Sequence, residues 1–511
     1  MYFTFFSILF LFSFWLMNHT LSYDPSTSAI LVGGKYWSDF SHALPLVRSF
    51  SYGSNLPPQY PGYPGEPIRY HFLFFALVGL LEKIGLRFDW ALNIPSALGF
   101  FALILMIFVL AKKLFAHTSV AALSVIFFLF NASFSWLDFI RRHPLADLPS
   151  LAQFPAFAPW NQSIIAAFWN LNIYTNQRHL GLSFALALAV IYILYTGGRR
   201  LYLVGLLLGI LLLINQAAFA AAGLFAFWFF ISRPVLRRPL TLSAIGSLPP
   251  ILFSLLFTRT SPHILFKPGF LLTDPLTLTS FTWYWLQNIG LHLLLIPLGF
   301  LLAPPKTRTL IIPLLALFIL PNLFQFSVDM VNNHKFFNFF LIVGSMFTAH
   351  LLIRFKPLLV LLPFLVLGGL IDFFPVLNDH YYSLSDYPKN PDVKFFAEST
   401  PRDAVVLNST WFYHPASLAG RKIFNGYSYF TWSFGYDQTG RERLTQAIYS
   451  ASSLPSACTL LVNNRINFVE LSARSEEFLR PNITLWHNQF IPAYTNPISG
   501  LTVYSTAQNC L

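Results

Sequence analysis

Long apolar runs, separated by short charged or polar stretches, recur along the first three quarters of the chain. In a lipid bilayer a helix satisfies its own backbone hydrogen bonds, and about 20 apolar residues are enough to cross it. The runs therefore predict an α-helical polytopic membrane protein with about eleven transmembrane helices. We expect these helices near residues 3–19, 92–111, 118–137, 181–197, 201–215, 218–232, 241–257, 286–303, 309–327, 336–353 and 357–374.

The composition excludes an ordinary soluble fold. Of the 511 residues, 55% are hydrophobic and 10% are charged, whereas about a quarter of the residues in a soluble protein are charged. The mean hydropathy is +0.57. Residues 3–17 lack a basic flank and a small-residue cleavage site, so we expect a retained first helix rather than a cleaved signal peptide.

The Lys and Arg residues gather in alternate loops, which predicts the orientation of the helices. The apolar stretch from His71 to Leu81 is too short to cross comfortably and ends in Glu82 and Lys83. If this stretch is an interfacial helix instead of a span, every second loop is basic. The basic residues of those loops are Lys112, Lys113, Arg199, Arg200, Arg233, Arg237, Arg238, Lys306, Arg308, Arg354 and Lys356.

This pattern predicts a cytoplasmic N-terminus and outward loops at 20–91, 138–180 and 328–335. The net charge of +12 is then a topology signal, and no nucleic-acid partner is expected. Composition changes after Phe374, where Asn, Asp, Ser and Tyr replace Leu and Phe. We therefore expect a membrane domain at 1–375 and a small extracytoplasmic α/β domain at 376–511.

Local patterns suggest the secondary structure of that second domain. Alternation predicts strands at 404–408, 459–463, 467–471 and 501–505, and a helix is expected near 441–450. Cys458 and Cys510 both lie in this region. A disulfide bond and two free thiols fit the sequence equally well.

The first outward loop carries two candidate pairs. Asp39 and His42 are three residues apart and share a face if this segment is helical. An outward acid can serve as a general base or a metal ligand, and Arg69 with His71 can hold a phosphate. The alternative is structural: Asp39 caps a helix that begins at Phe40, and Arg69 extends its charged end toward water.

The other two outward loops also carry candidate residues, which are Asp138, Asn176, Gln177, Arg178, His334 and Lys335. Ionisable residues at the rim of a span are functional candidates, and amides suit sugar hydroxyls. Alternatively, Asp138 pairs with Arg141 or Arg142, and Lys335 pairs with Asp329. Several polar loops on one side are typical of an active site at the membrane surface. No phosphate-binding loop, dinucleotide fingerprint, zinc spacing or G-x-S-x-G elbow is present in the sequence.

The order of these loops and helices along the chain resembles that of the GT-C class of membrane glycosyltransferases, which includes protein O-mannosyltransferases and aminoarabinose transferases. The resemblance rests on an outward acid after the first helix, an interfacial helix, an acid after the third helix and an outward C-terminal domain. Blocks similar to those of uncharacterised prokaryotic members are Asp39 with His42, Arg48-Ser49-Phe50, Arg69-Tyr70-His71-Phe72, Gln177-Arg178, Asn333-His334-Lys335-Phe336-Phe337-Asn338 and Gly420-Arg421 to Gly426-Tyr427.

The resemblance implies transfer of a sugar from a polyprenyl-phosphate donor to a glycan, lipid or protein acceptor at the extracytoplasmic face of a prokaryotic plasma membrane. It implies that Asp39 is a general base or metal-binding acid and that Asp138 is a second acid. The lipid phosphate would be held by Arg69, Arg178 or Lys335.

One departure from the class concerns the metal. The class often has paired acids in the first loop, whereas Phe40 and Ser41 follow Asp39 here, so a divalent metal cofactor is left open. Two other functions also remain open, a transporter or flippase of a lipid-linked saccharide and a non-catalytic scaffold for cell-envelope assembly. Transporters usually place polar sites near the bilayer midplane, whereas the polar residues here gather in outward loops.

Overall fold

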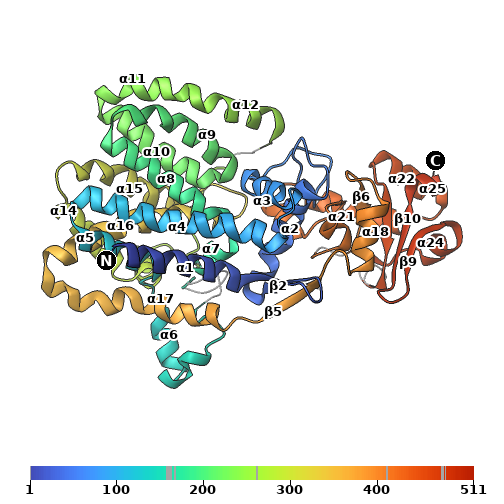
Figure 1. The fold of residues 1–511 in the computed structure, drawn as a ribbon, viewed down its shortest axis with the longest axis horizontal. Coiled ribbons are helices and arrows are strands. Elements are labelled where there is room, and N and C mark those ends of the chain that lie inside the picture. The colour runs from blue at the N-terminus through green and yellow to red at the C-terminus, as the bar shows by residue number, and fades with distance from the viewer. Residues whose placement is uncertain are drawn as a thin grey trace. The chain divides into compact units, whose positions relative to one another are not determined.

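A computed structural model describes residues 2–156, 164–165, 168–259, 263–409, 412–473, 477 and 479–510. The chain divides into two compact units, whose elements are labelled in Figure 1. Unit 1 comprises Met1–Thr20, Asn93–Phe253 and Pro262–His380, and unit 2 comprises Leu21–Leu92, Ser254–Ser261 and Tyr381–Leu511. The loop at 20–91, which is expected to face outward, thus belongs to the same unit as the C-terminal segment. This division describes packing, and the domains expected at 1–375 and 376–511 remain a prediction.

Unit 1 is a helical bundle. Its helices are α1 (Tyr2–Thr20), α4 (Phe88–Phe115), α5 (Thr118–Leu129), α6 (Ser135–Arg142), α7 (Asn172–Asn176), α8 (His179–Thr196), α9 (Val204–Ile214), α10 (Gln216–Ser232), α11 (Pro234–Ser243), α12 (Leu248–Phe257), α13 (Leu278–Ile289), α14 (His292–Leu302), α15 (Ile311–Leu323), α16 (His334–Arg354) and α17 (Leu362–Leu377). Short 3-10 turns are η2 (Leu145–Ser150), η4 (Arg199–Leu203), η5 (Ala244–Ser247), η6 (Thr307–Leu310), η7 (Met330–Asn333) and η8 (Lys356–Leu361), and a two-stranded sheet joins β3 (Leu265–Phe266) to β4 (Phe324–Gln325).

The helices confirm an integral membrane protein. In the described part of the chain, six helical segments are long and apolar enough to cross a bilayer: Phe3–Thr20, Phe88–Phe115, His179–Thr196, Pro234–Phe257, Met330–Arg354 and Lys356–Leu377. A bent pair, α13 with α14, makes up to seven. Shorter helices occupy the other expected positions, among them Thr118–Leu129, Val204–Ile214, Gln216–Ser232 and Thr307–Leu323, so the expected count of eleven crossings is not confirmed.

Two expected spans differ in shape from the prediction, and local chemistry explains both. The span expected at 118–137 ends with α5, because the Asn131 side chain accepts hydrogen bonds from the backbone and hydroxyl of Ser133 and forms a turn. The span expected at 286–303 is bent by 88° between α13 and α14. Gly290 lies there with φ +58°, and a Cβ on it would lie 1.8 Å from the Ala132 carbonyl oxygen.

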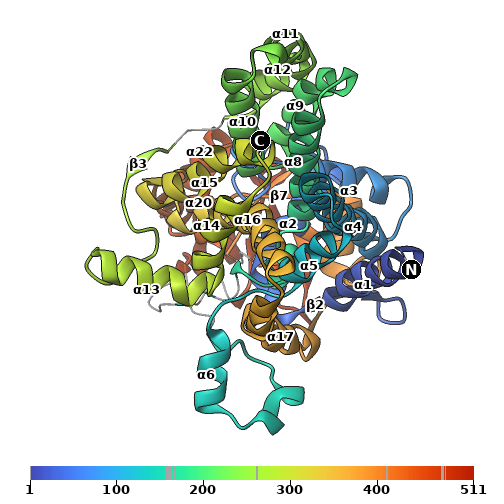
Figure 2. The same ribbon diagram turned by 90° about the vertical axis from the view of Figure 1, so that its left-hand side faces the viewer.

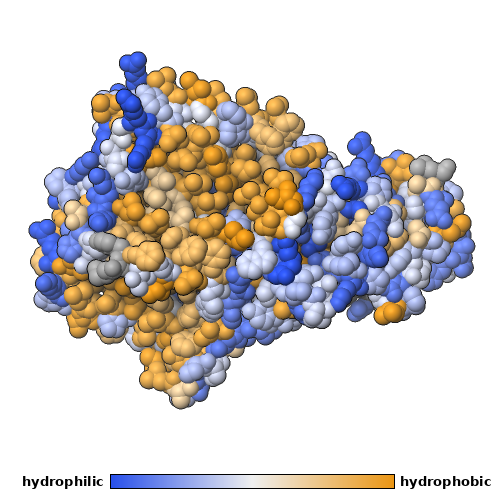
Figure 3. Space-filling view, viewed as in Figure 1, coloured by the Kyte–Doolittle hydropathy of each residue, from blue (hydrophilic) through white to orange (hydrophobic). Residues whose placement is uncertain are grey.

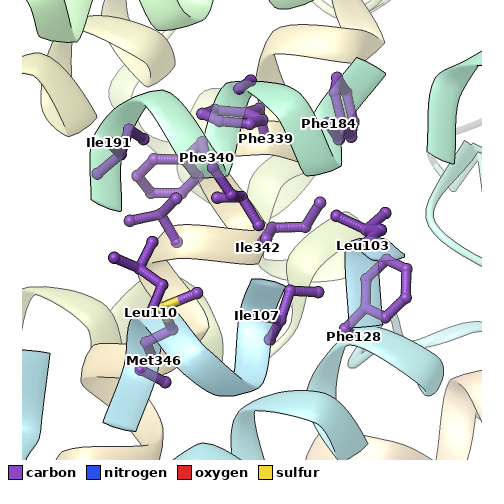
Figure 4. Close-up of a cluster of buried hydrophobic side chains, with 14 of the residues drawn as sticks. Leu103, Ile107, Leu110, Phe128, Phe184, Ile191, Phe339, Phe340, Ile342 and Met346 are labelled. Atoms are coloured by element: carbon purple, nitrogen blue, oxygen red, sulfur yellow. The ribbon is translucent and has the colours of Figure 1, made fainter. Parts of the chain in front are cut away.

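The core of unit 1 forms around α16, which contacts α5, α14 and α15 and lies near the middle of the bundle in Figure 2. Figure 4 shows side chains of α4, α5, α8 and α16 interdigitating. They include Leu103, Ile107, Leu110, Phe128, Phe184, Ile191, Phe339, Phe340, Ile342 and Met346. Apolar residues also cover most of the face of unit 1 that Figure 3 shows, whereas the C-terminal elements are more polar. An apolar exterior suits contact with lipid.

Unit 2 combines helices with small sheets. Its elements are β1 (Leu21–Asp24), β2 (Ala29–Gly33), η1 (Gly34–Tyr36), α2 (Trp37–Ser51), α3 (Leu73–Lys83), β5 (Tyr381–Ser385), α18 (Pro391–Ser399), β6 (Val405–Leu407), α19 (Pro415–Leu418), β7 (Lys422–Ile423), α20 (Ser428–Ser433), α21 (Gln438–Tyr449), α22 (Leu454–Asn463), β8 (Phe468–Leu471), α24 (Ile483–Gln489), β9 (Pro492–Asn496), β10 (Leu501–Ser505) and α25 (Thr506–Cys510). An antiparallel sheet β1-β2-β5 joins the first loop to the C-terminal segment, with Ala29 opposite Ser385.

A second sheet, in the order β7-β6-β8-β10-β9, confirms an α/β fold for the C-terminal segment. The strand expected at 459–463 is wrong, since this run lies in α22. Ser453 caps that helix by accepting a hydrogen bond from the Ser456 backbone, and Pro follows inside the first turn. Ala457 and Leu461, one helical turn apart, are buried. Cys458 of α22 and Cys510 of α25 form a disulfide bond.

Helix α3 occupies the segment expected to be an interfacial helix, and it packs against α2. The packing is close, because a Cβ on Gly79 would lie 2.7 Å from the Val47 carbonyl oxygen. The opposite side of α3 exposes Leu77 and Leu80. Helix α3 therefore has one face buried in protein and one apolar face exposed, as an interfacial helix requires.

Candidate active site

Asp39 lies in the first turn of α2 and is half-buried. The helix begins at Trp37, so Asp39 does not cap a helix that begins at Phe40. A carboxylate in the first turn is favoured by the helix dipole. Burial, and after it the negative charge of Asp39, raises the pKa of the Tyr70 and Tyr413 hydroxyls. The Tyr413 hydroxyl also donates to the Trp37 carbonyl, so Asp39 lies in an aromatic environment.

His42 lies one turn further along α2, and its ring is surrounded by aromatic rings. The centroid of the His42 ring lies 4.6 Å from that of Phe430, 5.4 Å from Tyr70 and 5.6 Å from Phe434. The residue is 9% exposed. Asp39 and His42 therefore lie about one turn apart on α2, as their spacing predicts, and both lie near Tyr70.

Arg69 and His71 lie just before α3. The Arg69 guanidinium forms an ion pair with Glu66 at 2.7 Å, donates to the Gly435 carbonyl and stacks over the Tyr436 ring at 4.9 Å. His71 is buried, with its ring centroid 3.6 Å from that of Tyr70. The charge of Arg69 is thus already paired with the Glu66 carboxylate, and contacts within unit 2 hold its guanidinium in position.

A buried ion triad that the sequence does not reveal holds α2 in place. Arg48 is 1% exposed and contacts the Asp386 carboxylate at 2.6 Å and the Glu82 carboxylate at 3.1 Å. Burial lowers the pKa of Arg48, but the charges of Glu82 and Asp386 outweigh it and raise that pKa above its usual value. Burial raises the pKa of Glu82, against the opposing effects of Arg48 and a hydrogen bond from Ser51.

Arg421 is a second buried cation of unit 2. Its guanidinium donates to the carbonyls of Tyr52, Ala397, Ala419 and Thr400 and to the Thr400 hydroxyl. Burial lowers the pKa of Arg421 to about 10. The neighbouring Gly420 has φ +78° and lies against α2, where a Cβ would lie 2.5 Å from the Arg48 carbonyl oxygen. These contacts give the Arg48 and Gly420-Arg421 blocks a structural role.

In unit 1, Arg178 lies at the start of α8 and is 2% exposed. Its guanidinium donates to the Thr20 hydroxyl at 2.7 Å, the Met17 carbonyl at 3.2 Å and the Asn93 side chain at 3.2 Å. Arg178 therefore joins the ends of α1, α4 and α8.

His334, Gln177 and Lys335 lie near one another at the start of α16. Nε2 of His334 lies 3.4 Å from Nε2 of Gln177, and its ring stacks on Phe168 at 4.7 Å between centroids. Lys335 donates to the Asn332 side chain at 3.0 Å. Asn176 donates to the Asn172 carbonyl at 3.1 Å. The structure thus brings Gln177 and His334 together in unit 1, and Lys335 follows His334 in α16.

Asp138 is half-buried in α6, outside that group. Within the described residues its carboxylate forms no hydrogen bond or ion pair, including none with Arg141 or Arg142. Residues 157–163 and 166–167 of the same expected loop lie outside the described residues.

Asp372, in α17, is a buried acid that sequence reasoning missed. It is fully buried, and its Oδ2 accepts from the Asn131 side chain at 3.1 Å and the Ser135 hydroxyl at 3.4 Å. Its Oδ1 has no hydrogen-bond partner in the described part of the chain. The sequence signal that could have found Asp372 is an acid inside an apolar run. Burying a charged side chain at membrane depth costs free energy, so such residues are candidates for a function.

A metal fits these surroundings poorly. Among the described residues, no three His, Cys, Asp or Glu side chains are grouped as metal ligands. The charge of Asp39 acts on the hydroxyls of Tyr70 and Tyr413, whereas hard divalent cations prefer several oxygen ligands, carboxylates above all. We therefore assign no chemical step to a metal.

No protein-family model matches the chain, and no curated protein sequence is similar to it. Solved structures of two GT-C glycosyltransferases are similar in fold. The chain therefore has a fold similar to that of apo ArnT, and the resemblance predicted from the sequence is confirmed at the level of fold.

The first of these proteins is ArnT of Cupriavidus metallidurans. Its apo structure aligns with a TM-score of 0.50 and 11% identity over 99% of this chain and 98% of ArnT. The structure of ArnT bound to undecaprenyl phosphate gives a TM-score of 0.49 and 10% identity over the same shares. The second protein is the oligosaccharyltransferase of Archaeoglobus fulgidus, solved with Zn and sulfate. It gives a TM-score of 0.45 and 12% identity over 97% of this chain and 73% of that protein.

Proposed function

We propose that this membrane protein is a glycosyltransferase that uses a polyprenyl-phosphate-linked sugar at the extracytoplasmic face. The observation that carries the proposal is the fold shared with apo ArnT over nearly the whole of both chains. Asp39, a half-buried acid in the first turn of α2, supports it. ArnT has been solved with undecaprenyl phosphate, and a donor of that kind needs no nucleotide-binding motif.

In the proposed reaction an acceptor O–H or N–H attacks the anomeric carbon of the donor sugar. The new glycosidic bond forms as the bond from that carbon to the phosphate oxygen breaks, and polyprenyl phosphate leaves. Asp39 takes the acceptor proton, since a hydroxyl or amide is a weak nucleophile without a base. The aromatic rings around Asp39 limit its access to water, which strengthens its interaction with a nearby proton donor.

We propose that cations of the expected set stabilise the departing phosphate. Lys335, beside His334 and Gln177, is our first choice for this role in unit 1. Arg178 joins three helix ends, and Arg69 balances Glu66, so removal of either one also disturbs structure. His42 is proposed as a catalytic residue beside Asp39, and Asp138 is proposed as the second acid. His71 and Asn176 are proposed to bind the substrate or its lipid phosphate. Eleven crossings, a cytoplasmic N-terminus and a prokaryotic plasma membrane complete the proposal.

The proposal is tested with Asp39→Asn in liposomes that contain the whole chain. The assay measures release of radiolabelled undecaprenyl phosphate from a panel of undecaprenyl-phosphate-linked sugars, with glycan, lipid and peptide acceptors. We expect loss of at least about 100-fold in turnover, the usual contribution of a general base. The control is Asp24→Asn, which changes an acid that is also half-buried, at the end of β1, where its carboxylate accepts hydrogen bonds from Ser26 and Thr27. We expect it to retain activity.

Two outcomes would contradict the proposal. Turnover by folded Asp39→Asn at the wild-type rate would exclude Asp39 as the base. Movement of the intact donor across the bilayer by the wild type, with no covalent product from any acceptor, would instead identify a flippase.

A further inference from the structure

A groove runs along the outside of unit 1 at one end of α4. It is lined by Phe6 of α1, by Tyr192 of α8, and by Leu105, Phe108, Val109, Lys112 and Lys113 of α4. Its volume of about 520 Å³ lies within the range of about 300–1,000 Å³ that is typical of ligand sites. Helices α1 and α4 lie side by side there (Figures 1 and 2), joined by ring contacts of Phe5 and Phe6 with Phe108.

The walls of the groove are apolar along most of its length. The Phe6 and Phe108 rings meet edge to face at 5.1 Å between centroids, and Phe108 is 5% exposed. Leu105, one turn before Val109, is 36% exposed. Because apolar side chains line the groove on the outside of a membrane bundle, the groove suits a hydrocarbon chain.

Polar groups at the groove occur at one end. Lys112 and Lys113 are exposed in the last turn of α4. The final carbonyls of that helix already have donors, since the Thr307 hydroxyl bonds to the Leu114 carbonyl at 2.9 Å and the Ala116 backbone bonds to the Lys112 carbonyl at 2.9 Å. The described lining contains no acid. An apolar slot that ends in two cations complements an amphiphile with an anionic head.

We propose that this groove binds one anionic phospholipid, with an acyl chain along Phe6, Leu105 and Val109 and its phosphate at Lys112 and Lys113. Basic pockets between transmembrane helices on the cytoplasmic side are known to take anionic headgroups. Positive residues at the expected cytoplasmic end of α4 place this lipid in the leaflet opposite the proposed reaction. The inference is independent of Asp39 and of the proposed function.

The test is native mass spectrometry of the delipidated whole chain in detergent. The probes are palmitoyl-oleoyl phosphatidylglycerol, the phosphatidylcholine with the same chains, and undecaprenyl phosphate. We expect the wild type to prefer phosphatidylglycerol. Lys112→Gln with Lys113→Gln should weaken phosphatidylglycerol binding by about 30-fold, or about 2 kcal/mol for two interfacial charges, and leave phosphatidylcholine binding unchanged.

Two control variants separate this groove from general surface charge. Arg199→Gln with Arg200→Gln removes another exposed basic pair that lies outside the groove, and it should retain the preference. Leu105→Trp fills the slot but retains both lysines, and it should weaken binding of both phospholipids. The proposal is overturned if the wild type has no headgroup preference, if both double variants lose it equally, if Leu105→Trp has no effect, or if undecaprenyl phosphate displaces phosphatidylglycerol at equal concentration.

Discussion

Replacement of Arg48 by Met tests whether the buried ion triad holds α2, and with it Asp39, in position. Met has a similar length and an apolar stem, so the change removes the charge and the hydrogen bonds with little loss of volume. It leaves Glu82 and Asp386 with side chains that are each 3% exposed and that face one another without a cation. Removing one member of a buried ion pair costs about 3–5 kcal/mol.

That cost should appear as local opening of unit 2. Since about 1.4 kcal/mol corresponds to a tenfold change, amide protection in α2 and α3 should fall by about two to three and a half orders of magnitude. The measurement is hydrogen–deuterium exchange with mass spectrometry of the whole chain in nanodiscs. Arg87→Met is the matched control, because Arg87 pairs with Asp89 at 2.6 Å and the Arg87 side chain is 38% exposed, whereas that of Arg48 is 2% exposed. Its loss should therefore lower amide protection less than the loss of Arg48.

The pH dependence of the Arg48→Met variant distinguishes loss of charge from loss of packing. Burial raises the pKa of Glu82 above its unfolded value, and without Arg48 the main opposing effect disappears. The folded variant then binds a proton more readily than the unfolded chain, so its stability rises as the pH falls toward the unfolded carboxyl pKa of about 4.3. The deficit in protection should therefore narrow from pH 8 to pH 5. Equal protection of Arg48→Met and Arg87→Met, or a deficit independent of pH, would refute the reasoning.

Three further predictions concern other parts of the chain. Gly53→Ala should lower the unfolding temperature in detergent, at a cost of about 1–3 kcal/mol, because a Cβ would lie 2.2 Å from the Gly420 carbonyl oxygen. Gly223→Ala should leave the unfolding temperature unchanged, because the space around Gly223 is open. Cys510→Ser should destabilise the C-terminal sheet by about 4 kcal/mol, from a loop of 52 residues, and exchange of the β10 amides with deuterium would measure it; unchanged exchange contradicts it. Asp372→Leu should destabilise unit 1 by about 1–3 kcal/mol, since it leaves buried Asn131 without its hydrogen-bond acceptor. Asp372→Asn should retain most of the stability in the same thermal assay. Equal unfolding temperatures of the two variants would exclude Asp372 as the acceptor that stabilises Asn131.

The helices were predictable from sequence because lipid exposure imposes a local rule. A run of apolar residues has to be helical at membrane depth whatever its neighbours are, and helices occupy every expected position. Breaks inside the runs were less predictable. Gly290 bends α13 from α14 because another backbone, at Ala132, approaches it closely, and no local pattern encodes that approach.

The assembly of unit 2 depends on contacts that are distant in sequence. Strand β2 pairs with β5, and Arg48 meets acids from α3 and from the segment after β5. The change in composition after Phe374 assigns Asp386 and Arg48 to different domains. The ion pair between them therefore could not be predicted from composition. Asp372 was missed for another reason, since the hydropathy of a whole run hides a single acid within it.

These buried arginines change what the family-like blocks mean. Arg48, Arg178 and Arg421 each lie in such a block, and all three are nearly fully buried and hydrogen-bonded to protein acceptors. A block of this kind can therefore be similar between proteins because it builds the fold, even where the chemistry differs. Asp39 differs from them, because it is half-buried in the first turn of α2, the helix that Arg48 joins to Glu82 and Asp386. It follows that substitution of the arginines reports on folding first, and that only Asp39→Asn tests the reaction directly.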